Sequence, residues 1–212
     1  MVTDIKQTIL SNMRAEHIPA AWSGLWYIQK AKIDTNSFVD KKGYLPSGIY
    51  TDLFRLTTAT LDKEPPGEVV MEDTPFELSK HLNFVLRATG SVLVTGLGLG
   101  CVVRGLLANP AVEHVTCIEK SSDVLKLVKP HMPVDRLTII QADALEWTKD
   151  NPLRFDCAWH DLWTDRDAGE PHLDHWHMKL FFNCRKNVSF QGAWAFNRGF
   201  RRQLRSHGLQ II

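Results

Sequence analysis

The chain has 212 residues, of which 44% are hydrophobic, so it can bury one sizeable core, and one main domain with an appendage is expected. Lys and Arg number 25 against 24 Asp and Glu, and this balance gives no overall attraction to nucleic acid or to an anionic membrane surface. The sequence shows neither the pattern of a signal peptide nor an apolar run of membrane-spanning length, so neither segment is expected. The four cysteines are widely spaced without C-x-x-C pairs, so we expect reduced thiols and a cytoplasmic protein.

Residues 1–73 carry the signals of a small α+β appendage. A helix is expected near residues 4–14, and residues 48–72 alternate apolar and polar side chains around the turn Lys63-Glu64-Pro65-Pro66-Gly67. Alternation on both sides of such a turn predicts a β-hairpin. We expect this hairpin to lie as a lid or cap on the main sheet of a second domain, formed by residues 74–212.

The second domain is predicted to open with a helix. Thr74 is a suitable N-cap, Pro75 suits the first helical position, and Glu77 completes a capping box three residues after the cap. The helix should extend to about Ala88 and end at Gly90, a residue that readily adopts the left-handed conformation after a helix.

From residue 91 onward, short apolar runs alternate with helical stretches. This alternation predicts an α/β fold, with a mainly parallel sheet and helices on both of its faces. A last strand at the sheet edge would invite pairing with a second copy, so a homodimer is expected. Helices are expected after the glycines, at Ser121-Ser122 and around 172–188, and strands at 91–95, 115–118, 137–140, 155–160, 193–196 and 209–212.

The predicted strand 91–95 leads directly into three glycines, in Val-Leu-Val-Thr-Gly-Leu-Gly-Leu-Gly. Gly96, Gly98 and Gly100 then stand at the carboxyl end of a parallel strand, where open α/β sheets bind their ligands. Glycine permits positive φ and close approach of a ligand, although the same residues also suit tight packing of a strand against the next helix. The dinucleotide fingerprint has its third glycine one position later, where this chain has Cys101, and this argues against NAD.

Acidic residues follow the next three predicted strands. Glu119 comes 23 residues after Gly96, where a carboxylate can accept both hydroxyl protons of a ribose. Asp143, with Ala144 beside it, follows the third strand, where a carboxylate can accept from an adenine amino group. Asp161 follows the fourth strand. Each acid by itself is also explained as a solvated turn residue or a helix cap, but together they favour an adenosyl ligand.

Residues 92–163 resemble the cofactor half of class I S-adenosylmethionine-dependent methyltransferases, and within them the spermidine synthase branch. The apolar Val94 is typical of that branch, and residues 109–115 and 136–138 resemble it too. The resemblance implies a Rossmann-like methyltransferase fold with S-adenosylmethionine as cofactor. It further implies that the amino-acid end of the cofactor is bound by Gly96, Gly98 and Gly100, the ribose by Glu119, and the adenine by Asp143 and Ala144.

The same resemblance places the chemistry at the end of the fourth strand. Asp161 lies where related transferases keep an acid beside the transferred group, and it would orient or deprotonate the acceptor. His160 is the alternative base, but strand alternation lets only one of the two face the site, and a satisfied buried histidine is the competing interpretation. Trp163 is a candidate for stacking on the substrate or, equally, a wall of the core.

We expect methyl transfer to an unidentified small-molecule or macromolecular nucleophile. Aminopropyl transfer from decarboxylated S-adenosylmethionine is the alternative, yet Thr164 stands where polyamine synthases carry a second acid, and Pro75 or Phe76 where they carry a tyrosine. Glu77 matches an acid of that family segment, which the capping box explains equally well. A cofactor-binding protein without turnover is the third hypothesis.

Two other groups of side chains contain residue types that bind metals or phosphates, but their spacing does not match that of a metal site or a phosphate-binding site. The histidines of the predicted helix 172–188 do not share one tight face, and Asp161 with Asn197 lacks a second acid, so no metal site is predicted. The arginines of 198–205 recur at the spacing of a solvated helix face, so no nucleic-acid partner is expected. These groups are His172, Asp174, His175 and His177, and Arg198, Arg201, Arg202 and Arg205.

Overall fold

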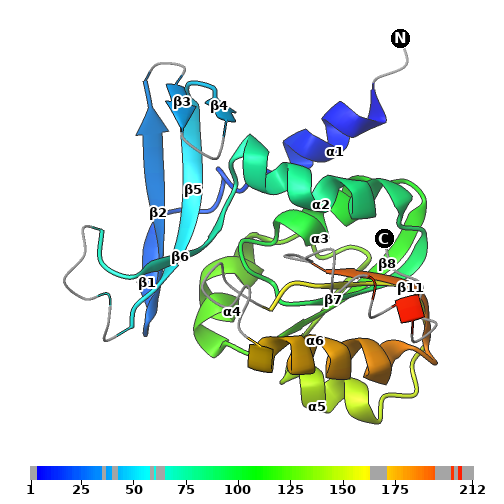
Figure 1. Ribbon diagram of the computed structural model, residues 1–212. Coiled ribbons are helices and arrows are strands. Elements are labelled where there is room, and N and C mark those ends of the chain that lie inside the picture. Colours follow the sequence, from blue (N-terminus) through cyan, green and yellow to red (C-terminus); the bar gives the residue numbers. More distant parts are fainter. Residues whose placement is uncertain are drawn as a thin grey trace.

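The computed structural model describes residues 4–34, 37–39, 43–57, 60, 65–162, 171–193, 202 and 205–206, with residues 37–39, 43–44 and 171–177 described by their backbone alone. It contains a parallel sheet between layers of helices and, beside it, a smaller antiparallel sheet (Figure 1). The mixed α/β architecture with helices on both faces of a parallel sheet is therefore confirmed.

The parallel sheet has the strand order β11-β10-β7-β8-β9. Within this sheet the chain first forms the central strand β7 and then β8 and β9 on one side of it. It then crosses back and forms β10 and β11 on the other side. The order therefore reverses between β7 and β10, and ligands bind at such a switch point in open α/β sheets. The strands are β7 (Gly90–Thr95), β8 (Val112–Glu119), β9 (Leu137–Gln141), β10 (Phe155–His160) and β11 (Val188–Ala193).

Helices cover the two faces of this sheet in two groups (Figure 1). Successive strand residues point to opposite faces, so Val92 and Val94 join a core with one group while Leu93 joins a core with the other. The first group is α1 (Ile5–Met13), α2 (Pro75–Arg87), α3 (Cys101–Ala108) and α4 (Ser122–Val128), which leads into the short 3-10 helix η1 (Lys129–His131); the second is α5 (Ala144–Lys149) and α6 (Pro171–Cys184).

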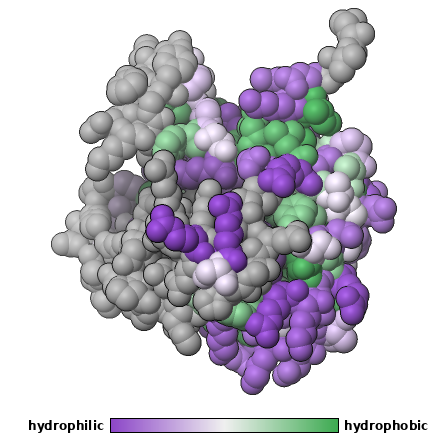
Figure 2. All heavy atoms as spheres, turned by 45° about the vertical axis from the view of Figure 1, so that its right-hand side comes forward, coloured by the Kyte–Doolittle hydropathy of each residue, from purple (hydrophilic) through white to green (hydrophobic). Residues whose placement is uncertain are grey.

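Hydrophobic side chains are concentrated in these two cores. Figure 2 shows hydrophilic residues gathered over the lower part of one face, where the hydrophobic residues that are coloured form small separate areas.

All four cysteines are buried free thiols. In the described part of the chain, no helix combines the length and the apolar character that a membrane crossing needs.

The smaller sheet, which we call the lid, has the antiparallel order β1-β2-β5-β6 and stands beside the ends of the parallel strands (Figure 1). Its last two strands are the predicted hairpin. Its strands are β1 (Ala21–Ser23), β2 (Trp26–Ile33), β5 (Gly48–Arg55) and β6 (Glu68–Glu72); β3 (Ser37–Val39) and β4 (Gly43–Leu45) form a separate two-stranded ribbon.

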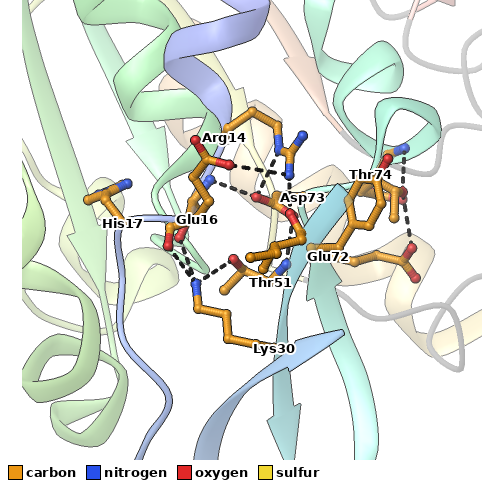
Figure 3. Close-up of polar contacts among 12 residues, drawn as sticks. Arg14, Glu16, His17, Lys30, Thr51, Glu72, Asp73 and Thr74 are labelled. Carbon is orange, nitrogen blue, oxygen red and sulfur yellow. Dashed lines mark hydrogen bonds and ion pairs between the residues drawn. The ribbon is translucent and has the colours of Figure 1, made fainter. Parts of the chain in front are cut away.

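A buried carboxylate joins the lid to the helices (Figure 3). Asp73 is fully buried between β6 and α2, and it accepts hydrogen bonds from Arg14 Nε at 3.1 Å, Ala15 N at 2.8 Å and Thr51 N at 2.7 Å. Lys30 from β2 donates to the Thr51 hydroxyl at 2.8 Å and to the Ala15 carbonyl at 3.3 Å. Because hydrogen bonds to a buried charge are strong, this cluster fixes the lid relative to α1 and α2.

Most predicted elements form, with two differences. The last strand among the described residues covers Val188–Ala193, where a helix was predicted up to residue 188 and a strand at 193–196. Gly90 has the expected positive φ, but α2 ends at Arg87 and Gly90 is the first residue of β7. Residues 194–196 and 209–212 lie outside the described residues. A boundary between residues 73 and 74 stays a prediction, and one hydrophobic core extends across that position.

Candidate functional site

A cavity of about 610 Å³ lies where the carboxyl ends of the parallel strands meet the lid. Its floor comes from the loops after β7, β8, β9 and β10, its roof from β2, β5 and β6, and one wall from the start of α2. The volume is within the 300–1,000 Å³ that is roughly typical of small-molecule sites. Five of the six predicted cofactor residues line it or lie beside it: Gly96, Gly98, Glu119, Asp143 and Ala144.

The glycine loop follows β7, and all three of its glycines have positive φ, at 93°, 51° and 75°. A Cβ atom at Gly96 would overlap the Asp161 carbonyl, one at Gly98 would overlap the Met71 sulfur, and one at Gly100 would overlap the Met132 sulfur. Gly100 is buried at the N-cap of α3 and does not line the cavity. The glycines therefore serve close packing within the protein, while the backbone of Gly96 and Gly98 faces the cavity.

Glu119, the last residue of β8, shapes this loop. Its Oε2 accepts from Leu97 N at 2.8 Å, and its Oε1 accepts from Ser121 N at 2.7 Å. A carboxylate has about four lone-pair positions, so two acceptor positions are left for hydroxyl donors. The structure thus gives Glu119 a role in ordering the loop and leaves it able to accept from a ribose.

Asp143 is the N-cap of α5 and accepts from Leu145 N at 2.9 Å. Its other oxygen lies 2.9 Å from Lys120 Nζ, and this hydrogen bond holds the pKa of Asp143 below its usual value. Asp143 is therefore a helix cap that also lines the cavity, and its contact with an adenine stays a prediction. An adenine amino group would share its carboxylate with Lys120.

Asp161 follows β10, and its backbone N–H donates to the Thr95 carbonyl at 2.9 Å, which places it beside the glycine loop at the switch point. The residue is half-buried and lines the cavity. Burial raises the pKa of Asp161 to about 6; the charge of Glu77 acts in the same direction, while His81 and Lys80 oppose it. A base with a pKa near the working pH is well suited to proton transfer.

His160 points to the opposite face of the sheet, as strand alternation requires. It is fully buried, its Nδ1 lies 3.0 Å from the Thr95 hydroxyl, and its Nε2 lies 3.0 Å from Gln191 Oε1. Its ring packs against Phe181 of α6 at 4.9 Å. His160 does not line the cavity, and its geometry matches the satisfied buried histidine rather than a base. Trp163 and Thr164 lie outside the described residues.

Several lining residues were not predicted. Trp26 and Arg55 are register partners in the lid, and the Arg55 guanidinium lies 5.8 Å from the Trp26 ring centre and 2.5 Å from Glu68 Oε1. Lys120 also lines the cavity, as does Glu77, which had a capping explanation. The alternation of β5 puts Leu53 and Arg55 on one face, but only the pairing of β5 with β2 reveals that this face is the roof.

Among the described residues, no three His, Cys, Asp or Glu side chains are grouped as metal ligands. The side chains of the histidines at 172, 175 and 177 are outside the described part, as is Asn197. The sequence therefore remains the basis for expecting no metal.

Comparisons with known proteins find similar solved structures but no match in sequence. No protein-family model matches the sequence, and no curated protein matches it. A spermidine synthase from Thermotoga maritima is 16% identical, with a TM-score of 0.46 over 81% of this chain and 52% of that chain. A spermidine synthase in complex with the transition-state analogue AdoDATO is 19% identical, with a TM-score of 0.48 over 81% and 54%. A putative RNA methyltransferase from Pyrococcus horikoshii is 16% identical, with a TM-score of 0.46 over 63% and 65%.

The structural neighbours are thus spermidine synthases and class I S-adenosylmethionine-dependent methyltransferases, as the sequence resemblance implied. The strand order of the parallel sheet and the helices on both of its faces give the chain a Rossmann-like α/β fold. It spans about half the length of the two spermidine synthase structures. With TM-scores below 0.5 and identities below 20%, these likenesses say nothing about cofactor, acceptor or residue roles, which must come from the site itself.

Proposed function

We propose that the chain is a transferase that binds S-adenosylmethionine, or a closely related adenosyl sulfonium, in the cavity under the lid, and transfers its methyl group to an acceptor. The observation that carries this proposal is the convergence of Glu119, Asp143 and Asp161 on one cavity at the switch point of the sheet. The three acids come from the ends of different strands, at positions where ligands bind in such sheets.

The described residues fit an adenosyl sulfonium. Glu119 keeps acceptor positions for the ribose hydroxyls, and Asp143 with Ala144 lines the side of the cavity next to β9. Gly96 and Gly98 line the cavity, so a ligand can approach their backbone closely. When bound, such a cofactor supplies a carbon that is activated by a positively charged sulfur.

Asp161 would be the catalytic residue. As a carboxylate beside the glycine loop, it would orient the acceptor and take up the proton that the nucleophilic atom loses on transfer. The lid would exclude water from the reacting groups, because Trp26, Leu53 and Met71 form an apolar part of the roof. His160 has no part in this proposal.

A second candidate is aminopropyl transfer from decarboxylated S-adenosylmethionine. One observation favours it: Glu77 and Asp161 both line the cavity, and a pair of acids suits a protonated amine. The two candidates differ in the cofactor, since only S-adenosylmethionine retains the carboxylate.

Titration calorimetry of the wild-type chain with S-adenosylmethionine, its decarboxylated form and methylthioadenosine separates these hypotheses. Tighter binding of the carboxylate-bearing compound supports methyl transfer, and tighter binding of the decarboxylated compound supports aminopropyl transfer. Binding without turnover by any amine, hydroxyl or thiol acceptor would indicate a cofactor-binding protein. If none of the three compounds binds, the proposed function is wrong.

A further inference from the structure

Behind the wall of the cavity lies the buried ring of His81. Its Nδ1 has no hydrogen-bond partner within the described residues, and its Nε2 lies 3.5 Å from Glu77 Oε1, at the limit of a hydrogen bond. The His81 side chain is 0% exposed, and its ring lies edge-on to the Trp159 ring at a distance of 5.5 Å. Unpaired buried polar groups are costly, so their presence in a native structure points to a role.

His81 is on the same helix as one acid of the cavity, and it packs against the strand that leads to the other. It follows Glu77 by one turn of α2, and its Nε2 lies 3.5 Å from Glu77 Oε1, while Glu77 Oε2 lies 2.6 Å from Lys80 Nζ. Trp159, the ring against His81, precedes Asp161 by two residues and so points to the same face of the sheet. Glu77 and Asp161 both line the cavity.

The two carboxylates have different electrostatic surroundings. Although burial acts to raise it, the pKa of Glu77 is lowered, because His81 and Lys80 stabilise its charge. The pKa of Asp161 is raised to about 6, mainly by burial. The thiol of Cys101 at the start of α3 also interacts with both acids, and burial raises its pKa far enough to keep it neutral. When their surroundings move the pKa values of two carboxyl groups in opposite directions, the two groups are suited to different roles in a reaction.

We propose that His81 is a positioning residue: its Nε2–H holds the Glu77 carboxylate against the cavity as an anion, so that Glu77 faces the positive charge of the ligand and Asp161 accepts the proton of the acceptor. This inference rests on the proposed function and deepens it. In the transfer, the acceptor atom bonds to the carbon as the carbon–sulfur bond breaks. The electron pair of that bond stays on sulfur, which becomes a neutral thioether, and the acceptor proton moves to the Asp161 carboxylate.

Two variants test the role of the ring nitrogen. His81→Phe keeps an aromatic ring against Trp159 but has no N–H, whereas His81→Gln places an amide N–H near the position of Nε2. Carboxyl carbon NMR, with Glu77→Gln and Asp161→Asn used for assignment, follows the titration of each acid without any ligand. In His81→Phe we expect the midpoint of Glu77 to rise by about one pH unit or more, with recovery in His81→Gln. An unchanged Glu77 midpoint in His81→Phe overturns the proposal.

Ring nitrogen NMR of the wild-type chain gives a test that needs no variant to fold. The proposal expects Nε2 of His81 to carry a proton at neutral pH, and an unprotonated Nε2 overturns it. Binding gives a third readout: His81→Phe should lower the affinity for S-adenosylmethionine relative to neutral methylthioadenosine by about tenfold, and His81→Gln should restore it. If the wild-type chain binds neither compound, the proposed function fails, while the NMR titration still decides the role of His81.

Discussion

Replacement of Asp161 by asparagine should stabilise the protein at pH 8. The residue is half-buried, and burial raises the pKa of its carboxyl from 3.8 to about 6. A raised pKa means that the folded state binds the proton more tightly than the unfolded state does. The ionised carboxylate therefore destabilises the fold, and Asp161→Asn removes that charge while keeping the shape of the side chain.

The sign and size of the effect follow from the two pKa values. Well below pH 3.8 the carboxyl is protonated in both states and costs nothing, and well above pH 6 it is ionised in both and the full penalty acts on the folded state. The difference corresponds to at most about 3 kcal/mol, and solvent contact of the half-buried side chain reduces it to about 1–2 kcal/mol.

Urea unfolding at pH 8 and at pH 4 measures this difference. We expect Asp161→Asn to exceed the wild type at pH 8 and to come close to it at pH 4, where most of the penalty is gone, while losing any transferase activity with cofactor affinity nearly intact. Asp143→Asn is the matched control of opposite sign: the hydrogen bond from Lys120 lowers the pKa of Asp143, so its charge stabilises the fold above its usual pKa. That partly exposed pair contributes about 1 kcal/mol or less. Equal stability of Asp161→Asn and wild type at pH 8 would refute the reasoning.

Two further predictions concern how the cavity is built, and both use the free energy of unfolding as readout. Asp73→Asn removes a fully buried charge that accepts three hydrogen bonds, so it should destabilise the protein by about 3–5 kcal/mol. Its control is Asp34→Asn, which breaks an exposed ion pair with Lys32 and should change the stability by less than about 0.5 kcal/mol. Gly96→Ala forces a Cβ into the Asp161 carbonyl at a φ of 93° and should cost more than about 2 kcal/mol. Gly48→Ala, where the nearest atom to the new Cβ is 4.0 Å away, is its control; equal losses within either pair would contradict the packing described.

The fold was predictable where hydrophobic pattern alone decides it. Phe155–His160 was predicted with the bounds that β10 has, because a short, mainly apolar run is typical of a strand between two layers of helices. Val188–Ala193 was missed because Gln191 looks like a surface residue. Gln191 is nevertheless buried, and its side chain forms hydrogen bonds with His160 and with the Phe181 carbonyl. Gly192 has its place because a side chain there would press on Trp159. Neither contact has a signal in the local sequence.

The site was predictable as far as the strand ends determine it. Glu119, Asp143 and Asp161 reach one cavity because parallel strands bring their carboxyl ends to one edge. Glu77 could not be assigned, since the residue that completes a capping box is the same residue type that a cavity wall can use. Trp26, Arg55 and His81 were missed because their positions depend on how the lid and α2 pack against the sheet.

The most direct test of the central claim, that the cavity binds an adenosyl sulfonium through Glu119, is calorimetry of S-adenosylmethionine with Glu119→Ala beside the wild type. Glu113→Ala is the matched control, since Glu113 lies exposed on the same strand outside the cavity. We predict measurable binding to the wild type and to Glu113→Ala, and an affinity more than about tenfold weaker in Glu119→Ala, from the loss of charge-assisted hydrogen bonds. Equal affinity in all three proteins would contradict the account.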